Sequence, residues 1–191
     1  MLNEDEARLI DRARQGDREA IGALYQKYVQ AVYRYVSYRV PEYAAVEDLA
    51  AEVFLRMVEG LPKYKLNGVP FEAWLYRIAA ARVADYYRTA SRHPQQALSD
   101  IEPAPLVSPE GMLQVEEEEC ALRAALRELS DEHQDILLLR FVERKSHAEV
   151  ALLLGKSVTA IKSAQHRALT RLAELMGSNG KTRHYLRGQD E

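Results

Sequence analysis

The sequence has few of the residues that build cross-linked, metal-bound or membrane-spanning proteins. Cys120 is the single cysteine among 191 residues, which excludes an intramolecular disulfide framework and a zinc site made of several cysteines. No apolar run approaches the roughly 18 residues of a membrane helix, and no apolar segment follows a basic start as it does in a signal peptide. These absences predict a cytoplasmic protein without a membrane span.

Catalytic patterns and strand patterns are missing as well. The five histidines are scattered, and there is no HExxH motif, glycine-rich phosphate loop or Walker pattern. The acidic run at 116–119 is typical of a solvated helix start, and Cys120 beside it is expected to be half-buried. No run of alternating β-branched residues indicates a strand. The sequence predicts no enzyme, no metal site and no cofactor.

Helical periodicity dominates the rest of the chain. Apolar residues recur at helical spacing over about 5–15, 18–40, 45–59 and 71–89, and again from about 112 onward. Asp17 is a suitable N-cap for the second of these helices, and glycines and prolines between 60 and 70 mark a loop. The third helix carries Val46, Leu49, Val53 and Met57 along one face. The pattern predicts an all-α fold.

A change of composition separates two helical parts. The segment HPQQALSDIEPAPLVSP at 93–109 holds four prolines and no lysine or arginine, which is typical of a linker. We therefore expect two small helical domains at 1–92 and 116–176, a flexible acidic linker at 93–115 and a disordered tail at 177–191.

The net charge of −3 conceals an uneven distribution. Residues 94–120 contain seven acidic and no basic side chains, whereas residues 61–93 contain six basic and two acidic ones. Residues 121–176 also have a basic excess. Because nucleic-acid affinity depends on local neutralisation of phosphates, the two basic blocks are the candidate DNA surfaces.

The segment from Ser146 to Leu172 predicts a helix-turn-helix. Gly155 permits a tight turn, and Ser157 is a suitable N-cap for the helix that follows. The first helix is expected to bury Ala148, Val150, Ala151 and Leu154, and the second Ile161, Ala164, Ala168 and Leu172. The opposite face of the second helix carries Lys162, Ser163, Gln165, His166 and Arg167, which are the long polar donors that major-groove reading needs. A helical bundle with a solvated basic face remains the alternative.

With the preceding run from Ala125, this segment resembles region 4 of bacterial RNA polymerase sigma factors. The matching residues are Leu129, Ile136, Leu139, Arg140, Glu149, Val150, Ala151, Leu154, Gly155, Ser157, Ile161, Lys162, Ser163, Arg167 and Ala168. The resemblance implies that four residues face the minus-thirty-five element: Lys162, Ser163, His166 and Arg167. Arg144 and Lys145 are expected to contact DNA phosphates.

A second segment, DLAAEVFLRMVEGLPKY at 48–64, resembles the sigma-factor region that grips the polymerase clamp coiled coil. The resemblance assigns polymerase binding to Asp48, Leu49, Glu52 and Phe54, with Leu49 and Phe54 partly outward as on a helix that docks on a partner helix. The family often has glutamine where this chain has Ala51. A core helix with a solvated acidic edge is the alternative.

A third segment, FEAWLYRIAAARVADYYR at 71–88, resembles the helix that recognises and opens the minus-ten element. Aromatic rings stack on unpaired bases for about 1–3 kcal/mol per base, and arginines neutralise phosphates. The residues assigned to this role are Tyr76, Arg77, Arg82, Tyr86 and Arg88, with the loop from Lys63 and Tyr64 to Gly68 holding a flipped base. At the positions where this chain has Ala80 and Ala81, the family commonly has arginine and asparagine. Core packing of Trp74, Leu75 and Ile78 is the alternative for part of this set.

The three segments in this order resemble the extracytoplasmic-function (ECF) sigma factors. The resemblance implies a protein that binds core RNA polymerase, directs promoter-specific initiation and assists promoter melting, with promoter DNA and in many cases an anti-sigma factor as partners. Two alternatives remain. One is a stand-alone helix-turn-helix regulator with an N-terminal sensing or dimerisation module, and the other is a helical adaptor that makes only protein contacts.

Overall fold

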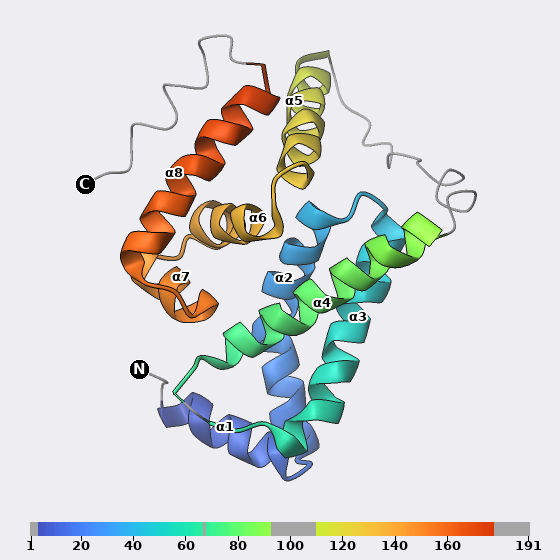
Figure 1. Ribbon diagram of the computed structural model, residues 1–191. Helices are drawn as coiled ribbons and strands as arrows, with labels where there is room; N and C mark the ends of the chain where they lie inside the picture. The colour runs from blue at the N-terminus through green and yellow to red at the C-terminus, as the bar shows by residue number, and fades with distance from the viewer. Residues whose placement is uncertain (1–3, 67, 93–109, 178–191) are drawn as a thin grey trace. The chain divides into compact units, whose positions relative to one another are not determined.

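The computed structural model describes residues 4–66, 68–92 and 110–177, without the side chains of Arg92 and 110–117. The regular secondary structure of these residues is entirely helical and includes no strand, which confirms the predicted all-α fold (Figure 1). The elements are α1 (Glu4–Arg14), α2 (Arg18–Arg39), α3 (Tyr43–Gly60), the 3₁₀ turn η1 (Leu61–Lys63), α4 (Phe71–Arg92), α5 (Glu110–Arg127), α6 (Asp131–Leu137), the π-helical segment η2 (Leu138–Val142), α7 (His147–Leu154) and α8 (Val158–Leu175).

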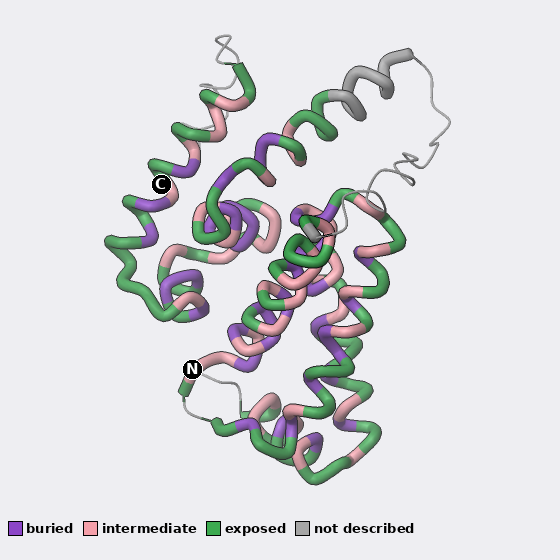
Figure 2. The backbone as a smooth tube through the Cα atoms, turned by 45° about the vertical axis from the view of Figure 1, so that its right-hand side comes forward, coloured by how far each residue is buried: buried purple, intermediate pink, exposed green. Residues whose placement is uncertain are grey.

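The chain divides into two compact units. In the N-terminal unit α2, α3 and α4 pack against one another, and α1 packs on α2 and η1. Buried residues recur at helical spacing along each of these helices (Figure 2), as expected of amphipathic helices around a shared core. The α4 contribution is a stripe of side chains at intervals of four residues, none more than 2% exposed: Phe71, Leu75, Ala79 and Val83.

The start of α2 is fixed by the predicted N-cap. The Asp17 carboxylate accepts hydrogen bonds from the backbone amides of Glu19 and Ala20 at 3.0 and 3.2 Å, and it pairs with Arg12. These contacts, with the Arg12 hydrogen bond foremost, hold the pKa of Asp17 below its ordinary value. Gly16 supplies the left-handed turn before it, at φ 87°. The capping prediction is confirmed.

An aromatic cluster closes the α3–α4 end of the N-terminal unit. The Tyr64 ring lies 4.7 Å from the Trp74 ring and 5.2 Å from the Phe71 ring, centroid to centroid. Gly60 lies directly beneath this cluster, because a Cβ built there would come within 2.7 Å of Trp74 Cζ2. The chain therefore uses glycine at this position to let the indole lie against the end of α3.

In the C-terminal unit, α6 and α5 pack on α8. The apolar side chains between them are the fully or nearly fully buried Ile136, Leu139, Ile161, Ala164 and Ala168. Gln134 is buried beside them and donates a hydrogen bond of 2.8 Å to the Leu129 carbonyl. This bond satisfies a buried amide and joins the end of α5 to α6.

Several local expectations are corrected by the structure. Ala148 is exposed, and Leu154 and Leu172 are only half-buried, whereas Leu153, which was not among the expected buried residues, is buried. Cys120 is exposed on α5, not half-buried. Helix α5 begins at Glu110, so that the last six residues of the predicted linker are helical.

Other predictions concern residues outside the ranges that the structure describes. Linker residues 93–109, Asn67 of the flipped-base loop and tail residues 178–191 lie outside the described residues. Across the described part, no helix is both long enough and apolar enough to cross a membrane.

The close approach of Gly60 to Trp74 gives the first prediction. Gly60→Ala should force the indole to move and lower the free energy of unfolding by about 1–3 kcal/mol. Trp74 is the only tryptophan, so its emission spectrum and urea titration measure both effects directly.

Gly22→Ala is the matched control, because Gly22 is also helical and a Cβ added there would have no atom within 4 Å. It should stabilise the protein by about 0.5–1 kcal/mol. If both variants unfold alike and leave the Trp74 spectrum unchanged, Gly60 is not required for this packing.

Candidate nucleic-acid interface

The helix-turn-helix is built from α7, a three-residue turn and α8. Gly155 has a φ of 66°, which a residue with a Cβ rarely adopts. The Ser157 hydroxyl then accepts a hydrogen bond of 3.1 Å from the Ala160 amide and caps α8. Both sequence predictions about this turn are confirmed.

The first helix of the motif begins with a reciprocal capping box. The Ser146 amide donates to a Glu149 carboxylate oxygen at 2.7 Å, and the Glu149 amide donates to the Ser146 hydroxyl at 3.2 Å. The hydrogen bonds from Ser146 hold the pKa of Glu149 below its ordinary value. This box fixes where α7 starts and so where the turn and α8 follow.

Helix α8 presents one polar face and one apolar face. Ile161, Ala164 and Ala168 are at most 1% exposed, so the side chains between them point away from the core. The residues predicted to read DNA are all exposed together on that outer face: Lys162, Ser163, His166 and Arg167. The structure brings this predicted set together.

Arg140 fixes the orientation of α8, a role that its place in the sequence did not indicate. Its Nε donates to the Gln165 side-chain oxygen at 2.9 Å, and its Nη1 donates to the Lys145 carbonyl. A second link joins Lys156 to Glu132 at 2.8 Å. The sequence pattern could not predict either contact, because each pair joins residues more than 20 positions apart.

The turn before α7 carries the two predicted phosphate contacts. Arg144 is exposed and Lys145 half-buried. Arg144 has a φ of 53°, an uncommon conformation for a residue with a side chain. Both lie next to the capping box, at the N-terminal end of α7.

On α4, only part of the predicted set is exposed. Arg77 and Arg88 are exposed, and Tyr86 is half-buried with its hydroxyl donating to Glu42 at 3.0 Å. Tyr76 is 5% exposed and packs against Tyr35 at 5.2 Å between ring centroids. The expectation of an open stacking face is wrong for Tyr76, because it lies beside the buried stripe.

In the loop before α4, too, only some of the predicted residues are exposed. Lys63 is exposed, whereas Tyr64 is 8% exposed and held in the aromatic cluster. Burial raises the pKa of Tyr64, against the opposing effect of the nearby Arg77 charge. Tyr64 therefore supports the shape of the loop and is not open to a base. Tyr87, which was not in the predicted site, is 40% exposed at the end of α4.

Helix α3 differs from the expected docking helix in one respect. Asp48 is exposed and Leu49 half-buried, but Phe54 is 6% exposed and packs edge-on against Tyr25 at 4.8 Å. The expectation that Phe54 lies partly outward is wrong. Beyond Tyr43 at its first position, the large apolar side chains that α3 exposes are Leu55 and Val58, at 57% and 40%.

The sequence contained a signal for these two residues. Asp48, Ala51, Leu55 and Val58 are spaced by three, four and three positions, and all four are exposed. That spacing is the seam along which one helix packs on another. We call these four residues the α3 seam.

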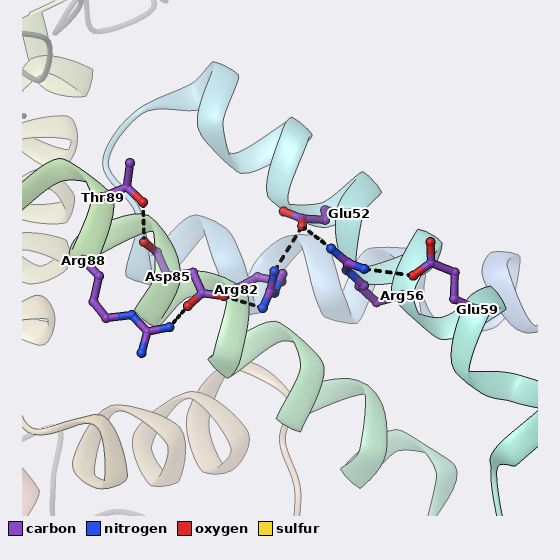
Figure 3. A network of polar contacts seen from close by, with 7 residues as sticks. All are labelled: Glu52, Arg56, Glu59, Arg82, Asp85, Arg88 and Thr89. Atoms are coloured by element: carbon purple, nitrogen blue, oxygen red, sulfur yellow. Dashed lines mark hydrogen bonds and ion pairs between the residues drawn. The ribbon is translucent and has the colours of Figure 1, made fainter.

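Glu52 and Arg82, predicted for two different partners, contact each other (Figure 3). Arg82 Nη1 lies 3.1 Å from Glu52 Oε1, and Arg82 Nη2 pairs with Asp85. Asp85 also pairs with Arg88, and Glu52 lies 3.6 Å from Arg56. The network thus joins the predicted polymerase helix α3 to the predicted minus-ten helix α4.

Among the described residues, no three histidine, cysteine or carboxylate side chains are placed to hold a metal ion. The geometry of the described residues defines a helix-turn-helix protein whose second helix has an exposed polar face, together with a second helical unit.

Comparison with known proteins identifies the family. Residues 24–93 match Sigma-70 region 2, and residues 121–172 match Sigma-70 region 4. The ECF RNA polymerase sigma factor BldN of Streptomyces coelicolor is 36% identical over 175 residues, which cover 91% of this chain and 66% of BldN. The ECF sigma factor ShbA of Streptomyces griseus is 33% identical over 177 residues, covering 87% and 93%.

A solved structure supports the fold. The sigma factor RpoE of Bartonella quintana, in complex with the anti-sigma factor NepR, has a TM-score of 0.55 at 21% identity and covers 83% of this chain and 97% of that one. The chain belongs to the sigma-70 family of RNA polymerase sigma factors, within its ECF group. It is a sigma factor of transcription initiation. The match to region 2 shows that its N-terminal part is a sigma-factor domain and not the sensing or dimerisation module of a stand-alone regulator.

The capping box gives a pH prediction. A carboxyl whose pKa is lowered by folding stabilises the protein above its ordinary value of 4.5, and the effect disappears as the pH falls through the lowered pKa. Glu149→Gln should therefore lower the free energy of unfolding at pH 7, and lower it by less at an acidic pH below 4.5.

Urea titrations of both proteins at the two pH values measure this change. Glu128→Gln serves as the control, because Glu128 is an exposed carboxyl of the same unit and lies outside the capping box. A Glu149→Gln effect that is equal at both pH values contradicts the assignment to charge.

Proposed function

We propose that α8 reads the minus-thirty-five element, that α4 contacts the minus-ten element and that the α3 seam binds core RNA polymerase. The chain would act in the cytoplasm, would have no catalytic activity of its own and would leave the chemistry to the polymerase. Its domains are proposed at 1–92 and 110–176, with 93–109 as linker and 177–191 as a tail.

The observation that carries this proposal is the exposed polar face of α8. Its apolar face is anchored by Ile161, Ala164 and Ala168, and its orientation is held by the Arg140–Gln165 hydrogen bond. Four polar side chains therefore project from a rigid support, as base readout in a major groove requires. Arg144 and Lys145 would add phosphate contacts that set the register.

The α4 contribution is narrower than the sequence suggested. Arg77 and Arg88 are exposed and would pair with DNA phosphates. The Tyr87 ring is also exposed and would stack on an unpaired base. Tyr86 would assist by packing edge-on against Tyr87, at 5.1 Å between ring centroids. Lys63, which is exposed in the preceding turn, would add a phosphate contact.

The α3 seam suits an amphipathic partner helix. Leu55 and Val58 supply the apolar anchors, and Asp48 with its neighbour Leu49 completes one end. A helix of core polymerase that carries apolar residues and a basic residue would match it. Because RpoE is captured with an anti-sigma factor, we propose that an anti-sigma factor competes for this chain too.

Removing the Arg167 guanidinium tests whether α8 recognises the minus-thirty-five element. Arg167→Ala should weaken promoter-specific transcription by about 1–3 kcal/mol if Arg167 reads a base edge. Arg171→Ala is the matched control, because Arg171 is exposed one turn further along and pairs with Glu174. An unchanged promoter preference of Arg167→Ala would remove this residue from the site.

Two substitutions test the α3 seam. Leu55→Asp and Asp48→Arg should each weaken binding to core polymerase about tenfold or more, equivalent to about 1.4 kcal/mol. Both residues are exposed, so circular dichroism should show an intact fold. Leu66→Asp makes the same change at a 40% exposed leucine outside the seam, and titration with core should find its affinity unchanged. Wild-type affinity for both seam variants would contradict the assignment.

A further inference from the structure

Arg82 is shared between two carboxylates that belong to different helices. Glu52 approaches it from α3 at 3.1 Å, and Asp85 pairs with it from one turn further along α4. The Arg82 side chain is 24% exposed, against 70% for Arg88. Figure 3 shows the guanidinium between the two helices, with the Glu52 carboxylate above it.

This arrangement withholds Arg82 from DNA. A phosphate that approaches the guanidinium meets two carboxylates already bound to it, and like charges at this range repel. The phosphate has to displace one of them. Asp85 lies on the same helix as Arg82 and moves with it, whereas Glu52 lies on the helix that carries the α3 seam.

We propose that Glu52 restrains Arg82 in the free protein, and that binding of core polymerase to α3 draws the Glu52 carboxylate away and releases Arg82 to a DNA phosphate. The inference rests on the proposed polymerase and DNA roles of α3 and α4. It gives the sigma factor low DNA affinity on its own and higher affinity within the polymerase complex.

Thermodynamic linkage makes the effect reciprocal. If polymerase binding strengthens DNA binding by some factor, DNA binding strengthens polymerase binding by the same factor. Here the shared group is one carboxylate, for which Arg82 and a basic side chain of the polymerase compete. Arg56, 3.6 Å from Glu52 and half-exposed, lies on α3 with Glu52 and moves with that helix.

The test measures the affinity of the full chain for a fluorescent oligo(dT) strand over a range of salt concentrations. Glu52→Gln should bind the strand about threefold more tightly than wild type and increase the salt slope by about 0.7, which is one additional single-strand phosphate contact. In an Arg82→Gln background the same substitution should add no contact.

Glu59→Gln is the matched control. Glu59 lies on α3, pairs with Arg56 at 3.0 Å and is about half-exposed, so this variant removes the same charge without touching Arg82. An equal effect of the two glutamine variants, or a Glu52→Gln effect that persists without Arg82, would overturn the proposal. Should Glu52→Gln melt at a lower temperature, Glu52→Asp keeps the charge but shortens the reach, and it should show the same gain.

The polymerase complex supplies the second arm. Bound to core, wild type and Glu52→Gln should have the same affinity for the strand, because polymerase has already released Arg82. A persistent advantage of Glu52→Gln in the complex would overturn the coupling. Failure of the wild-type chain to bind core would instead contradict the proposed function, whatever the free protein shows.

Discussion

The buried stripe of α4 is the constraint on which the N-terminal unit depends. Phe71, Leu75, Ala79 and Val83 recur at intervals of four and are almost completely buried. Because a helix has 3.6 residues per turn, this stripe fixes which side chains lie on the opposite face. Arg77, Ala81, Ala84 and Arg88 are exposed there, and Tyr76, next to the stripe, is buried. One helix thus supplies both the core and the surface proposed to face DNA.

The same principle governs α8, but with smaller side chains. Ala164 and Ala168 allow α8 to approach α6 closely, with Ile161 filling the space at its N-terminal end. Close packing, the Ser157 cap and the Arg140–Gln165 bond leave α8 little freedom to rotate. The recognition role proposed for α8 needs this rigidity, because a small displacement of its long side chains would move them away from the base edges.

Charge pairing then divides the basic residues into available and restrained groups. Lys162, Arg167 and Arg77 are exposed, whereas Arg82 is held by carboxylates from two helices. Simple counting of lysines and arginines in 61–93 treats these residues as equal. A basic block in a sequence is therefore an upper limit on the charge that a protein offers to DNA, since ion pairs remove part of it.

The family was predicted from the resemblance of three segments to known sigma factors. Local sequence was enough to predict the helical fold, the Asp17 and Ser157 caps and the turn at Gly155. These features depend on residues within one or two turns of each other, so spacing and backbone preference suffice. The four polar residues of α8 could be grouped for the same reason, because a single helix orders them. Tertiary packing instead settled how far Phe54, Tyr64 and Tyr76 are buried, and that Glu52 and Arg82, thirty positions apart, meet. Helical periodicity gives the direction of a side chain on its own helix, but it carries no information about which neighbouring helix lies in that direction.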